Sequence, residues 1–250
     1  IKYKILTAIQ EQNVLPGLVT KKFCNKVDLI IISFKETRKY ILNKNLLYTG
    51  NPIRSIIKKI NKEDARSKIG IYKNKFTILI IGGSQGAKSI NEHFINHYKQ
   101  YIDKDIQIIW QVGKHSKEIA NKIVNTNIKI FDFIYEMDIA YSASDLIISR
   151  AGATAISEIL YLGIPSILIP YPFAANNHQE INAMTLEEKK TTIMIKEDEL
   201  KKGKLENSIF KLSSSKEKIN IYKNNIKKYS KKNSAYLIKK QIKAMILDAR

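Results

Sequence analysis

The sequence is poor in cysteine, and it contains no long apolar run. Cys24 is the single cysteine among 250 residues, which excludes an internal disulfide framework and suggests a reducing compartment. We expect Cys24 to be a small buried hydrophobic residue. No apolar run approaches the roughly 20 residues that span a bilayer, and no pattern of a signal peptide is present. The chain begins Ile1-Lys2-Tyr3 without a methionine, which predicts a start inside a longer gene product.

Acidic residues are also scarce relative to basic ones. The chain has 23 Asp and Glu against 43 Lys and Arg, which gives a formal charge of +20 and a pI near 9.7. Such a charge suits nucleic acid, an anionic lipid surface or phosphorylated substrates. The abundance of Lys, Ile and Asn also fits an AT-rich genome, so composition leaves open whether the charge is functional. Because neither regular Arg spacing nor aromatic interleaving marks a nucleic-acid surface, we predict no nucleic-acid partner.

Residues for metal or covalent chemistry are few. The histidines are His93, His97, His115 and His178, and none lies at metal-ligand spacing from a Cys or a carboxylate, so we predict no metal site. His93 and His97 share a helix face without the glutamate of an HExxH motif, and we expect them to be solvated or packed. No Gly-x-Ser-x-Gly elbow is present and Cys24 has no evident activating partner, so no covalent nucleophile is predicted.

Strand-like and helix-like segments alternate along most of the chain. Strands are predicted at Val27–Ser33, Leu46–Tyr48, Phe76–Ile81, Ile106–Trp110, Ile128–Phe133, Asp145–Ser149, Ser166–Pro170 and Thr192–Ile195. Helices are predicted at Asn61–Ile69, Ala87–Tyr101, His115–Val124, Met137–Ser144, from Thr154 through Glu158, and Gln179–Lys189. This repeated β–α–β order predicts an α/β fold with a doubly wound parallel sheet.

Two regions interrupt this pattern. Gly50-Asn51-Pro52 indicates a turn or hinge, and the domain boundary is expected near Pro52–Ile60. The tail after Leu205 is rich in Lys and Asn with scattered apolar residues, which predicts two or three amphipathic helices.

Two predicted strands end in glycine turns that lead directly into helices. The turns are Gly82–Ala87, which follows an apolar strand, and Arg150–Ala153. Free amides at a helix N-terminus attract phosphates, and the helix dipole adds about 0.3–1 kcal/mol. Ser84 can offer its N–H and its hydroxyl, although the first turn is neither a GxGxxG nor a Walker motif. Ordinary tight turns, with Thr154 as a plain N-cap of the second helix, are the alternative.

Three side chains complete this candidate site. Glu158 lies about one turn into the second helix, where ribose hydroxyls could donate to it at about 1.5–3 kcal/mol per bond. Arg54 is either a solvated residue or a guanidinium beside a pyrophosphate. Asn13, in the segment Glu11–Gly17, either points its amide at a sugar or lies in a mere surface loop. The pattern predicts binding of a nucleoside diphosphate.

The ordered set of motifs resembles the MurG family of bacterial N-acetylglucosaminyltransferases in glycosyltransferase family 28. It runs from about Gln10 to about Lys196 and comprises Glu11-Gln12-Asn13, Gly50–Arg54, Gly82–Ala87, Arg150–Ala153 with Ser157-Glu158, and His178-Gln179. The resemblance implies a GT-B fold of two Rossmann-like domains. It divides the chain into the remaining part of an N-terminal acceptor domain (1–54), a C-terminal UDP-sugar domain (55–212), and C-terminal helices (213–250) that pack back on the N-terminal domain.

The resemblance also implies an activity. It is the inverting, metal-independent and cofactor-free transfer of N-acetylglucosamine from UDP-N-acetylglucosamine to the C4 hydroxyl of the muramyl sugar of lipid I. The product is lipid II, for peptidoglycan synthesis. The implied location is peripheral, on the anionic cytoplasmic face of the bacterial inner membrane. A chain that binds the UDP-sugar without turnover and a GT-B transferase with another acceptor are the alternatives.

Site residues are implied position by position. The donor-binding positions are Asn13, Arg54, Ser84, Ile134, Ala153, Thr154, Ala155, Ile156, Ser157, Glu158 and Gln179. Ile134 would contact uracil through its backbone, Glu158 the ribose, and Gln179 the transferred sugar. Ser84 and the helix after it would meet the diphosphate.

The sequence departs from the family at its start. The family's N-terminal glycine-rich loop and its histidine have no counterpart before Gln10, which itself stands where the family usually carries His. We therefore name no catalytic base, and we expect roughly the first half of the acceptor domain to be lacking.

Overall fold

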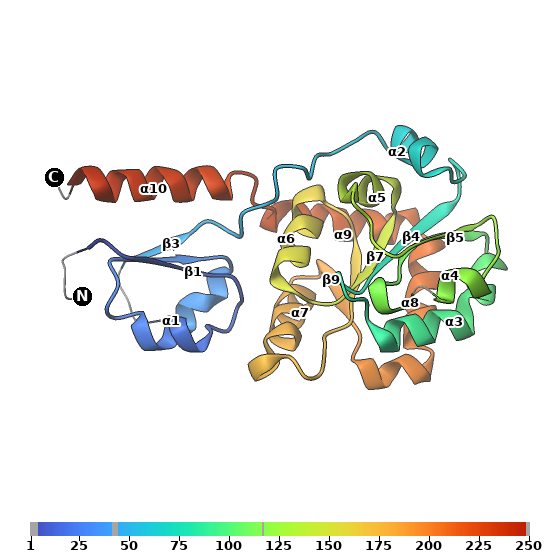
Figure 1. Cartoon of the computed structure of the whole chain (residues 1–250), viewed down its shortest axis with the longest axis horizontal. Helices are drawn as coiled ribbons and strands as arrows, with labels where there is room; N and C mark the ends of the chain where they lie inside the picture. Colours follow the sequence, from blue (N-terminus) through green and yellow to red (C-terminus); the bar gives the residue numbers. More distant parts are fainter. Residues whose placement is uncertain (1–4, 42–44, 117, 249–250) are drawn as a thin grey trace.

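Two parallel β-sheets organise the computed structural model, which describes residues 5–41, 45–116 and 118–248 (Figure 1). The smaller sheet has the order β1-β2-β3, the larger has the order β6-β5-β4-β7-β8-β9, and their paired strands are parallel. The strands are β1 (Ala8–Glu11), β2 (Leu29–Ile32), β3 (Leu46–Tyr48), β4 (Phe76–Ile81), β5 (Ile106–Gln111), β6 (Ile128–Phe131), β7 (Leu146–Ser149), β8 (Ser166–Leu168) and β9 (Thr192–Met194). The predicted α/β class is confirmed.

Helices connect the strands and form the C-terminal tail. The α-helices are α1 (Leu18–Phe23), α2 (Lys62–Ile69), α3 (Lys88–Ile102), α4 (Glu118–Lys122), α5 (Met137–Ala143), α6 (Ala153–Leu162), α7 (His178–Glu188), α8 (Lys204–Ser213), α9 (Lys216–Tyr229) and α10 (Ser234–Asp248). Short 3₁₀ helices are η1 (Lys35–Tyr40), η2 (Lys114–Ser116), η3 (Ala175–Asn177) and η4 (Glu197–Lys202).

Strand β4 lies at the centre of the larger sheet and is buried on both faces. Ile78 and Ile80 pack into one apolar cluster with residues of α3 and α8. Leu79 and Ile81 alternate with them and pack into a second cluster with residues of α2, α5 and α6. Because successive side chains of a strand point to opposite faces, a continuous apolar run is what a sheet covered on both sides requires.

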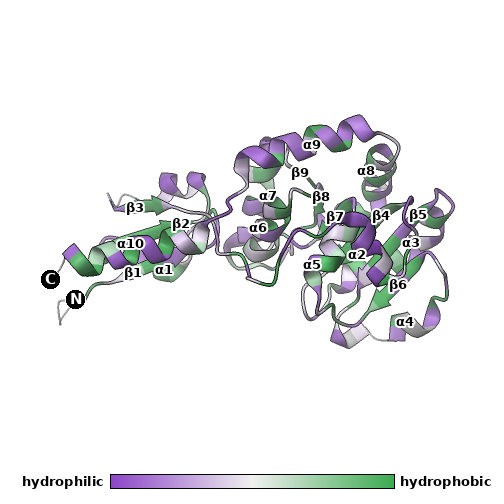
Figure 2. Ribbon diagram, turned by 90° about the horizontal axis from the view of Figure 1, so that it is seen from above, coloured by the Kyte–Doolittle hydropathy of each residue, from purple (hydrophilic) through white to green (hydrophobic). Residues whose placement is uncertain are grey.

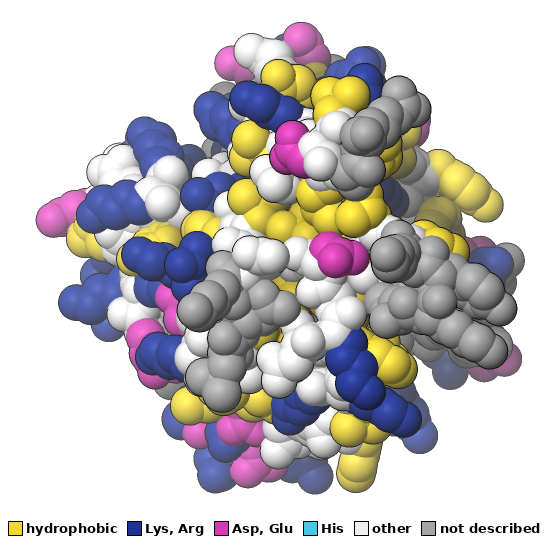
Figure 3. Space-filling model, turned by 90° about the vertical axis from the view of Figure 1, so that its left-hand side faces the viewer, with side chains coloured by type: hydrophobic (Ala, Val, Ile, Leu, Met, Phe, Trp, Pro, Cys, Tyr) yellow, Lys and Arg dark blue, Asp and Glu magenta, His cyan; other side chains and the backbone are white. Residues whose placement is uncertain are grey.

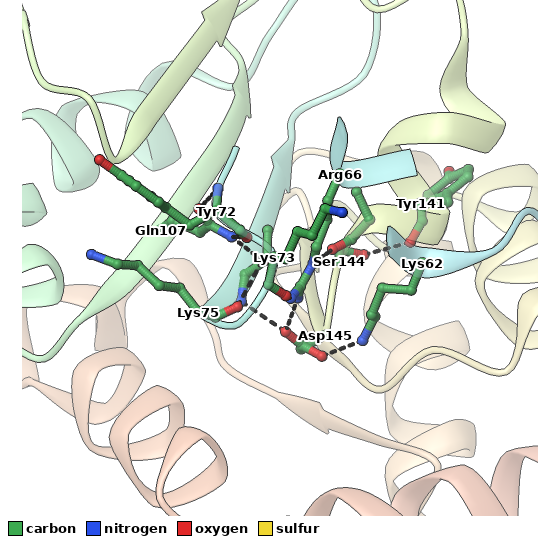
Figure 4. Close-up of polar contacts among 11 residues, drawn as sticks. Lys62, Arg66, Tyr72, Lys73, Lys75, Gln107, Tyr141, Ser144 and Asp145 are labelled. Carbon is green, nitrogen blue, oxygen red and sulfur yellow. Dashed lines mark hydrogen bonds and ion pairs between the residues drawn. The ribbon is translucent and has the colours of Figure 1, made fainter. Parts of the chain in front are cut away.

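Asp145 fixes α2 to the amino-terminal edge of the larger sheet, just before β7 (Figure 4). Its Oδ2 accepts a hydrogen bond from the Thr77 amide at 2.8 Å and pairs with Arg66 Nη2 at 2.6 Å. Lys62 pairs with the other carboxylate oxygen. Asn61 caps α2, since its Oδ1 accepts from the Glu63 amide at 2.8 Å. These polar contacts hold a helix whose sequence is otherwise mostly charged.

The chain crosses between the two sheets twice. The first crossing follows β3 and the second joins α9 to α10, which lies beside the smaller sheet (Figures 1 and 2). Ser234 Oγ donates to the Thr49 carbonyl at 2.7 Å, and Lys231 Nζ lies 4.4 Å from the centre of the Tyr48 ring. The final helix is thereby attached to the end of β3.

The end of the molecule formed by the smaller sheet and α10 exposes apolar side chains among lysines and arginines (Figure 3). Large exposed apolar residues of this part are Ile5, Leu18, Val19, Tyr236 and Leu247. In the described part of the chain, no helix is long and apolar enough to cross a membrane.

The first 40 residues depart most from the sequence-based expectation. Neither β1 nor α1 is predicted from the sequence, because a strand of four residues and a helix of six are too short to show periodicity. Glu11 ends β1 and is buried, where it accepts from Thr20 Oγ1 at 2.6 Å and the Gly17 amide at 2.9 Å. The segment Glu11–Gly17 is therefore an ordered junction, and reading it as a mere surface loop is wrong. Cys24 is buried, as expected.

One predicted helix has other bounds in the described residues. The segment His115–Val124 forms η2 and the short α4, and residue 117 between them lies outside the described residues.

Candidate functional site

A cleft of about 890 Å³ opens at the carboxyl edge of the larger sheet. Its floor is the junction of β4 and β7, which are paired neighbours with Ile81 opposite Ser149. After β4 the chain continues to β5, the neighbour of β4 away from β7. After β7 it continues to β8, the neighbour of β7 away from β4. Ligands of doubly wound sheets bind at such a topological switch point, outside the carboxyl ends of the strands.

Two helices begin at this cleft without side-chain caps. The N-cap of α3 is Ala87 and that of α6 is Gly152, and neither side chain bonds to the helix. The first intrahelical bond of α6 runs from the Ile156 amide to the Gly152 carbonyl at 3.0 Å. The amides before Ile156 therefore have no partner within their helix, which favours an anion. Because Gly152 holds the cap position, the alternative of Thr154 as a plain N-cap is wrong.

Two positions of the glycine turn Gly82–Ala87 accept only glycine. Gly86 has a φ of +81°, and a Cβ there would lie 2.1 Å from the Val112 carbonyl oxygen. A Cβ on Gly82 would lie 2.3 Å from the Ala87 amide nitrogen. The turn consequently exposes backbone to the cleft with little side-chain cover.

Glu158 is the only carboxylate of α6, and it is 2% exposed at the wall of the cleft. Arg54 binds it with two hydrogen bonds, Nε to Oε1 at 2.6 Å and Nη2 to Oε2 at 2.9 Å. The Tyr141 hydroxyl donates to Oε2 at 3.2 Å. The bond to Glu158 raises the pKa of Arg54, and burial together with the Glu158 charge raises the pKa of Tyr141. Arg54 thus stays charged and Tyr141 stays a donor.

Gln111 joins the turn Gly82–Ala87 to the loop after β6, and sequence reasoning missed it. Its Nε2 donates to the Gly83 carbonyl at 2.9 Å, and its Oε1 accepts from the Ile134 amide at 2.9 Å. The Ile134 N–H is therefore engaged, and only the Ile134 carbonyl is open to a ligand. The available signal was a polar residue at the carboxyl end of β5, which is apolar at Ile106, Ile108, Ile109 and Trp110.

Arg150 braces the opposite wall, a role that its motif did not reveal. Its Nη1 donates to the carbonyls of Ile169 and Pro170 at 3.2 and 3.1 Å, and its Nη2 pairs with Glu197 at 2.5 Å. Gln179 Oε1 accepts from the amides of Ala151 and Tyr171 at 3.2 and 3.0 Å. Because both bonds use Oε1, the Nε2 group of Gln179 can donate to a ligand without breaking them.

The structure brings together most of the predicted site residues, but not all. Those lining the cleft are Arg54, Ser84, Ile134, Thr154, Ala155, Glu158 and Gln179. Four lie outside its lining, namely Asn13, Ala153, Ile156 and Ser157. Ile156 is 1% exposed in the apolar core, and Ser157 Oγ donates to the Ala153 carbonyl at 2.7 Å. The side chains of α6 alternate between cleft and core because a helix turns 100° per residue.

Asn13 and Asn51 instead lie where the two sheets meet. Asn13 Oδ1 accepts from Asn182 Nδ2 of α7 at 2.9 Å. Asn51 is buried, accepts from Gln10 Nε2 at 2.9 Å, and donates to Ser157 Oγ at 3.0 Å. These amides hold the smaller sheet against α7 and α6.

His93 is packed in the interior, which is one of the two expected environments, but it has a partner that the sequence does not indicate. His93 is buried and its Nε2 lies 2.9 Å from Glu206 Oε1, although no carboxylate stands near it at ligand spacing in the sequence. His97 Nδ1 lies 2.7 Å from the His93 carbonyl oxygen, and His178 Nδ1 lies 2.7 Å from that of Ala175.

Comparison with known proteins agrees with this geometry. Residues 77–242 match the family model described as the glycosyltransferase family 28 C-terminal domain. A protein of Christiangramia forsetii is 35% identical over 97% of this chain and 66% of its own length. One of Halalkalibacterium halodurans is 41% identical over 80% of this chain and 56% of its own. Both are named UDP-N-acetylglucosamine–N-acetylmuramyl-(pentapeptide) pyrophosphoryl-undecaprenol N-acetylglucosamine transferases.

Solved structures show the same fold. Acinetobacter baumannii MurG superposes with a TM-score of 0.74 at 22% identity, over 96% of this chain and 67% of that one. The calicheamicin glycosyltransferase superposes with a TM-score of 0.60 at 13% identity, over 86% of this chain and 50% of that one. The two sheets are thus those of a GT-B fold, as the sequence resemblance implies. The chain spans 56% and 66% of the length of the two curated relatives described above.

Proposed function

Because the chain belongs to glycosyltransferase family 28, we propose that it takes part in the transfer of N-acetylglucosamine from UDP-N-acetylglucosamine to lipid I. The acceptor group is the C4 hydroxyl of the muramyl sugar, and the product is lipid II, a precursor of peptidoglycan. The names of the relatives support this activity. The observation that carries it is the convergence of two uncapped helix N-termini and one buried carboxylate, Glu158, on a single cleft.

The donor is proposed to lie across the switch point of the larger sheet. Its diphosphate meets the amides that begin α3 and α6, together with Ser84. Its ribose hydroxyls donate to Glu158, and its uracil donates to the Ile134 carbonyl. The Nε2 group of Gln179 reaches the hydroxyls of the transferred sugar, because its Oε1 is held by two backbone amides.

The reaction proposed for this arrangement is an inverting displacement. The acceptor oxygen attacks the anomeric carbon from the face opposite the diphosphate, the bond from that carbon to the β-phosphate oxygen breaks, and the acceptor loses its proton. Negative charge then grows on the leaving UDP. Uncapped amides and the Arg54 guanidinium stabilise that charge, and the amides need no reorganisation because the turn and the helix ends are already in place. No residue is assigned as the base.

Two measurements test the proposal. Calorimetry with UDP-N-acetylglucosamine, against UDP-glucose as the matched control, should give one site per chain that prefers the N-acetylated sugar. A radiolabelled donor incubated with a lipid I analogue should then yield labelled lipid II. Absence of donor binding in the first measurement would overturn the proposed site itself.

A second candidate is a chain that binds the UDP-sugar without turnover. Two observations favour it. The chain spans 66% and 56% of the length of the two relatives. The donor cleft lies at the larger sheet, whereas the smaller sheet has three strands in the described residues. Donor binding without labelled lipid II distinguishes this case. The calicheamicin enzyme carries the same fold, so product formed only with a different acceptor would indicate a transferase of another specificity.

The proposed location is the cytoplasmic face of the inner membrane, by peripheral attachment. The net charge of +20 supports it. So does α10, which exposes Tyr236 and Leu237 beside Lys239, Lys240 and Lys243. Each lysine near an anionic leaflet contributes about 1 kcal/mol. Sedimentation with vesicles containing 30% phosphatidylglycerol should be lost in high salt and with purely zwitterionic vesicles, and salt-independent behaviour would contradict it.

A further inference from the structure

Beside the nucleotide cleft, two histidines of α3 and one glutamate of α8 converge on one point. His93 and His97 are one helical turn apart, and their rings stack with centroids 4.4 Å apart. Glu206 lies in the first turn of α8, and its Oε1 is 2.9 Å from His93 Nε2. One ligand atom from each of the three residues lies within 4.8 Å of the other two. Imidazole nitrogens and a carboxylate therefore share one small volume.

Glu206 contains a polar atom that the described part of the chain does not satisfy. Its side chain is 10% exposed, and its Oε2 is buried without a hydrogen-bond partner among the described residues. A buried carboxylate oxygen ordinarily has a partner, because desolvation without one is costly. A cation bound next to Glu206 would provide that partner.

His97 is already oriented as a metal-binding histidine is. Its Nδ1 lies 2.7 Å from the carbonyl oxygen of His93, so Nδ1 carries the proton and donates it there. This tautomer leaves the lone pair of His97 Nε2 for a ligand. Metal-bound histidines almost always donate their other ring N–H in this way, to a carboxylate or a backbone carbonyl.

The two histidines of the cluster face a cavity. Its volume is about 560 Å³, and His93, His97, Ser89, Glu92 and Lys201 are among its lining residues, whereas Glu206 is not. His93 is buried against the protein, whereas His97 is half-buried. An ion can enter from this side, and a water molecule can occupy a coordination position that the protein leaves open.

We infer that His93, His97 and Glu206 bind one divalent transition-metal ion of the zinc class, with solvent as a further ligand. Two imidazoles and one carboxylate suit Zn²⁺, whereas Mg²⁺ and Ca²⁺ prefer oxygen ligands throughout. Ligand atoms about 2.0–2.1 Å from a tetrahedral ion lie roughly 3.3 Å apart, so the three atoms, now within 4.8 Å of one another, must adjust to that spacing when an ion binds. The ion would tie α3 to α8 in a structural role.

Binding has a proton signature. The Nε2 of His93 faces Glu206 Oε1 at hydrogen-bond distance, and it donates a proton there when no ion is bound. A metal ion needs the lone pair of that nitrogen, so it must shift or displace the proton. A displaced proton that leaves the protein gives a buffer-dependent enthalpy of binding, which loose attachment at the surface would not give.

The test uses the full chain without a histidine tag, stripped with chelator. Co²⁺ is titrated as a visible-absorption probe and displaced by Zn²⁺, and Zn²⁺ is titrated by calorimetry in two buffers. We expect one ion per chain and a rise in the melting temperature. His97→Ala and Glu206→Gln should each weaken affinity at least tenfold. His178→Ala is the matched control and should bind as the parent does, because His178 lies outside the cluster.

Each outcome decides the assignment. Binding of one Zn²⁺ that is lost in His97→Ala, a half-buried position that the fold tolerates, supports the site even if Glu206→Gln unfolds. No saturable binding by the parent chain would overturn it, and would leave His93 and Glu206 as a plain hydrogen-bonded pair. Equal weakening by His178→Ala, or unchanged binding in His97→Ala, would likewise overturn it.

Discussion

Arg54 and Glu158 are joined by a bidentate ion pair, although they are 104 residues apart in the chain. Arg54 lies on the crossing between the sheets and Glu158 on α6, so the pair spans the wall of the cleft. A carboxylate offers about four acceptor sites, and Arg54 and Tyr141 occupy three of them. One ribose hydroxyl can therefore bind Glu158 directly, whereas a second must displace one Arg54 bond. The released guanidinium nitrogen is then available to a phosphate.

Removing the charge of Glu158 should weaken nucleotide binding without unfolding the chain. Glu158→Gln loses the charge-assisted bonds to ribose, each contributing about 1.5–3 kcal/mol, so the Kd for UDP-N-acetylglucosamine should rise about ten- to a hundredfold. The fold should survive because Arg54 is 48% exposed and stays solvated. Calorimetry measures the effect, with the exposed Glu63→Gln of α2 as control. Unchanged affinity in Glu158→Gln would place the ribose elsewhere.

The first glycine turn permits a matched pair of substitutions. Gly83 and Gly86 have φ values of +86° and +81°, but a Cβ on Gly83 meets nothing within 4 Å, whereas one on Gly86 meets the Val112 carbonyl. Gly83→Ala should cost only the strain of the left-handed backbone, roughly 1–2 kcal/mol. Gly86→Ala should lower the free energy of unfolding by at least twice as much and should also weaken donor binding. Urea denaturation measures both, and equal losses would contradict the close approach.

How much of the fold and of the site the sequence predicts depends on how far apart in the chain the contacting residues lie. Strands β4 and β5 are recognisable because burial on both faces demands continuous apolar runs. The two glycine turns are recognisable because each lies between a predicted strand and a predicted helix. A helix that begins there exposes its first amides. The position of Glu158 one turn into the second helix indicates it as a site residue, the family resemblance adds Gln179, and the structure places both in the cleft lining.

What escapes prediction is pairing between distant residues. Arg54 with Glu158 and His93 with Glu206 are brought together only by the packing of helices, so no spacing rule reveals them. Gln111 is hidden for a different reason, since its side chain bonds to backbone groups that carry no sequence signal. The implied uracil contact through the Ile134 backbone is restricted to its carbonyl by that same bond.

Asp145 should contribute to stability and not to binding. Its carboxylate pairs with Arg66, whose side chain is 5% exposed, and loss of one partner leaves a buried charge unpaired. Asp145→Asn should therefore lower the free energy of unfolding by about 3 kcal/mol. The exposed Asp103→Asn is the control and should change it by less than about 0.5 kcal/mol. Because Asp145 lies at the amino end of β7, donor affinity should be retained, and its loss would contradict the separation of the two ends.

Lys223 of α9 should make stability depend on pH in the alkaline range. Burial lowers its pKa below the ordinary value of 10.5, and Lys62, Lys59 and Lys227 lower it further against the opposing charge of Asp145. The folded state therefore disfavours the charged form. The charged lysine therefore destabilises the folded state fully at neutral pH. This destabilisation disappears as the pH rises from the lowered pKa of the folded state to the ordinary pKa of 10.5. Lys223→Met should raise the free energy of unfolding at pH 7, by no more than about 1 kcal/mol because the group is partly solvated.

The pH dependence of that gain distinguishes charge from packing at position 223. A purely hydrophobic benefit of methionine would be the same at pH 7 and above pH 10.5, whereas relief of a desolvated charge should shrink as the lysine of the parent loses its proton. Lys223→Arg is the matched control, because arginine keeps its charge throughout the range and should give no gain at pH 7. Urea denaturation at both pH values measures the difference. A gain for Lys223→Met that stays constant with pH would show that burial of the lysine charge does not limit the stability of α9.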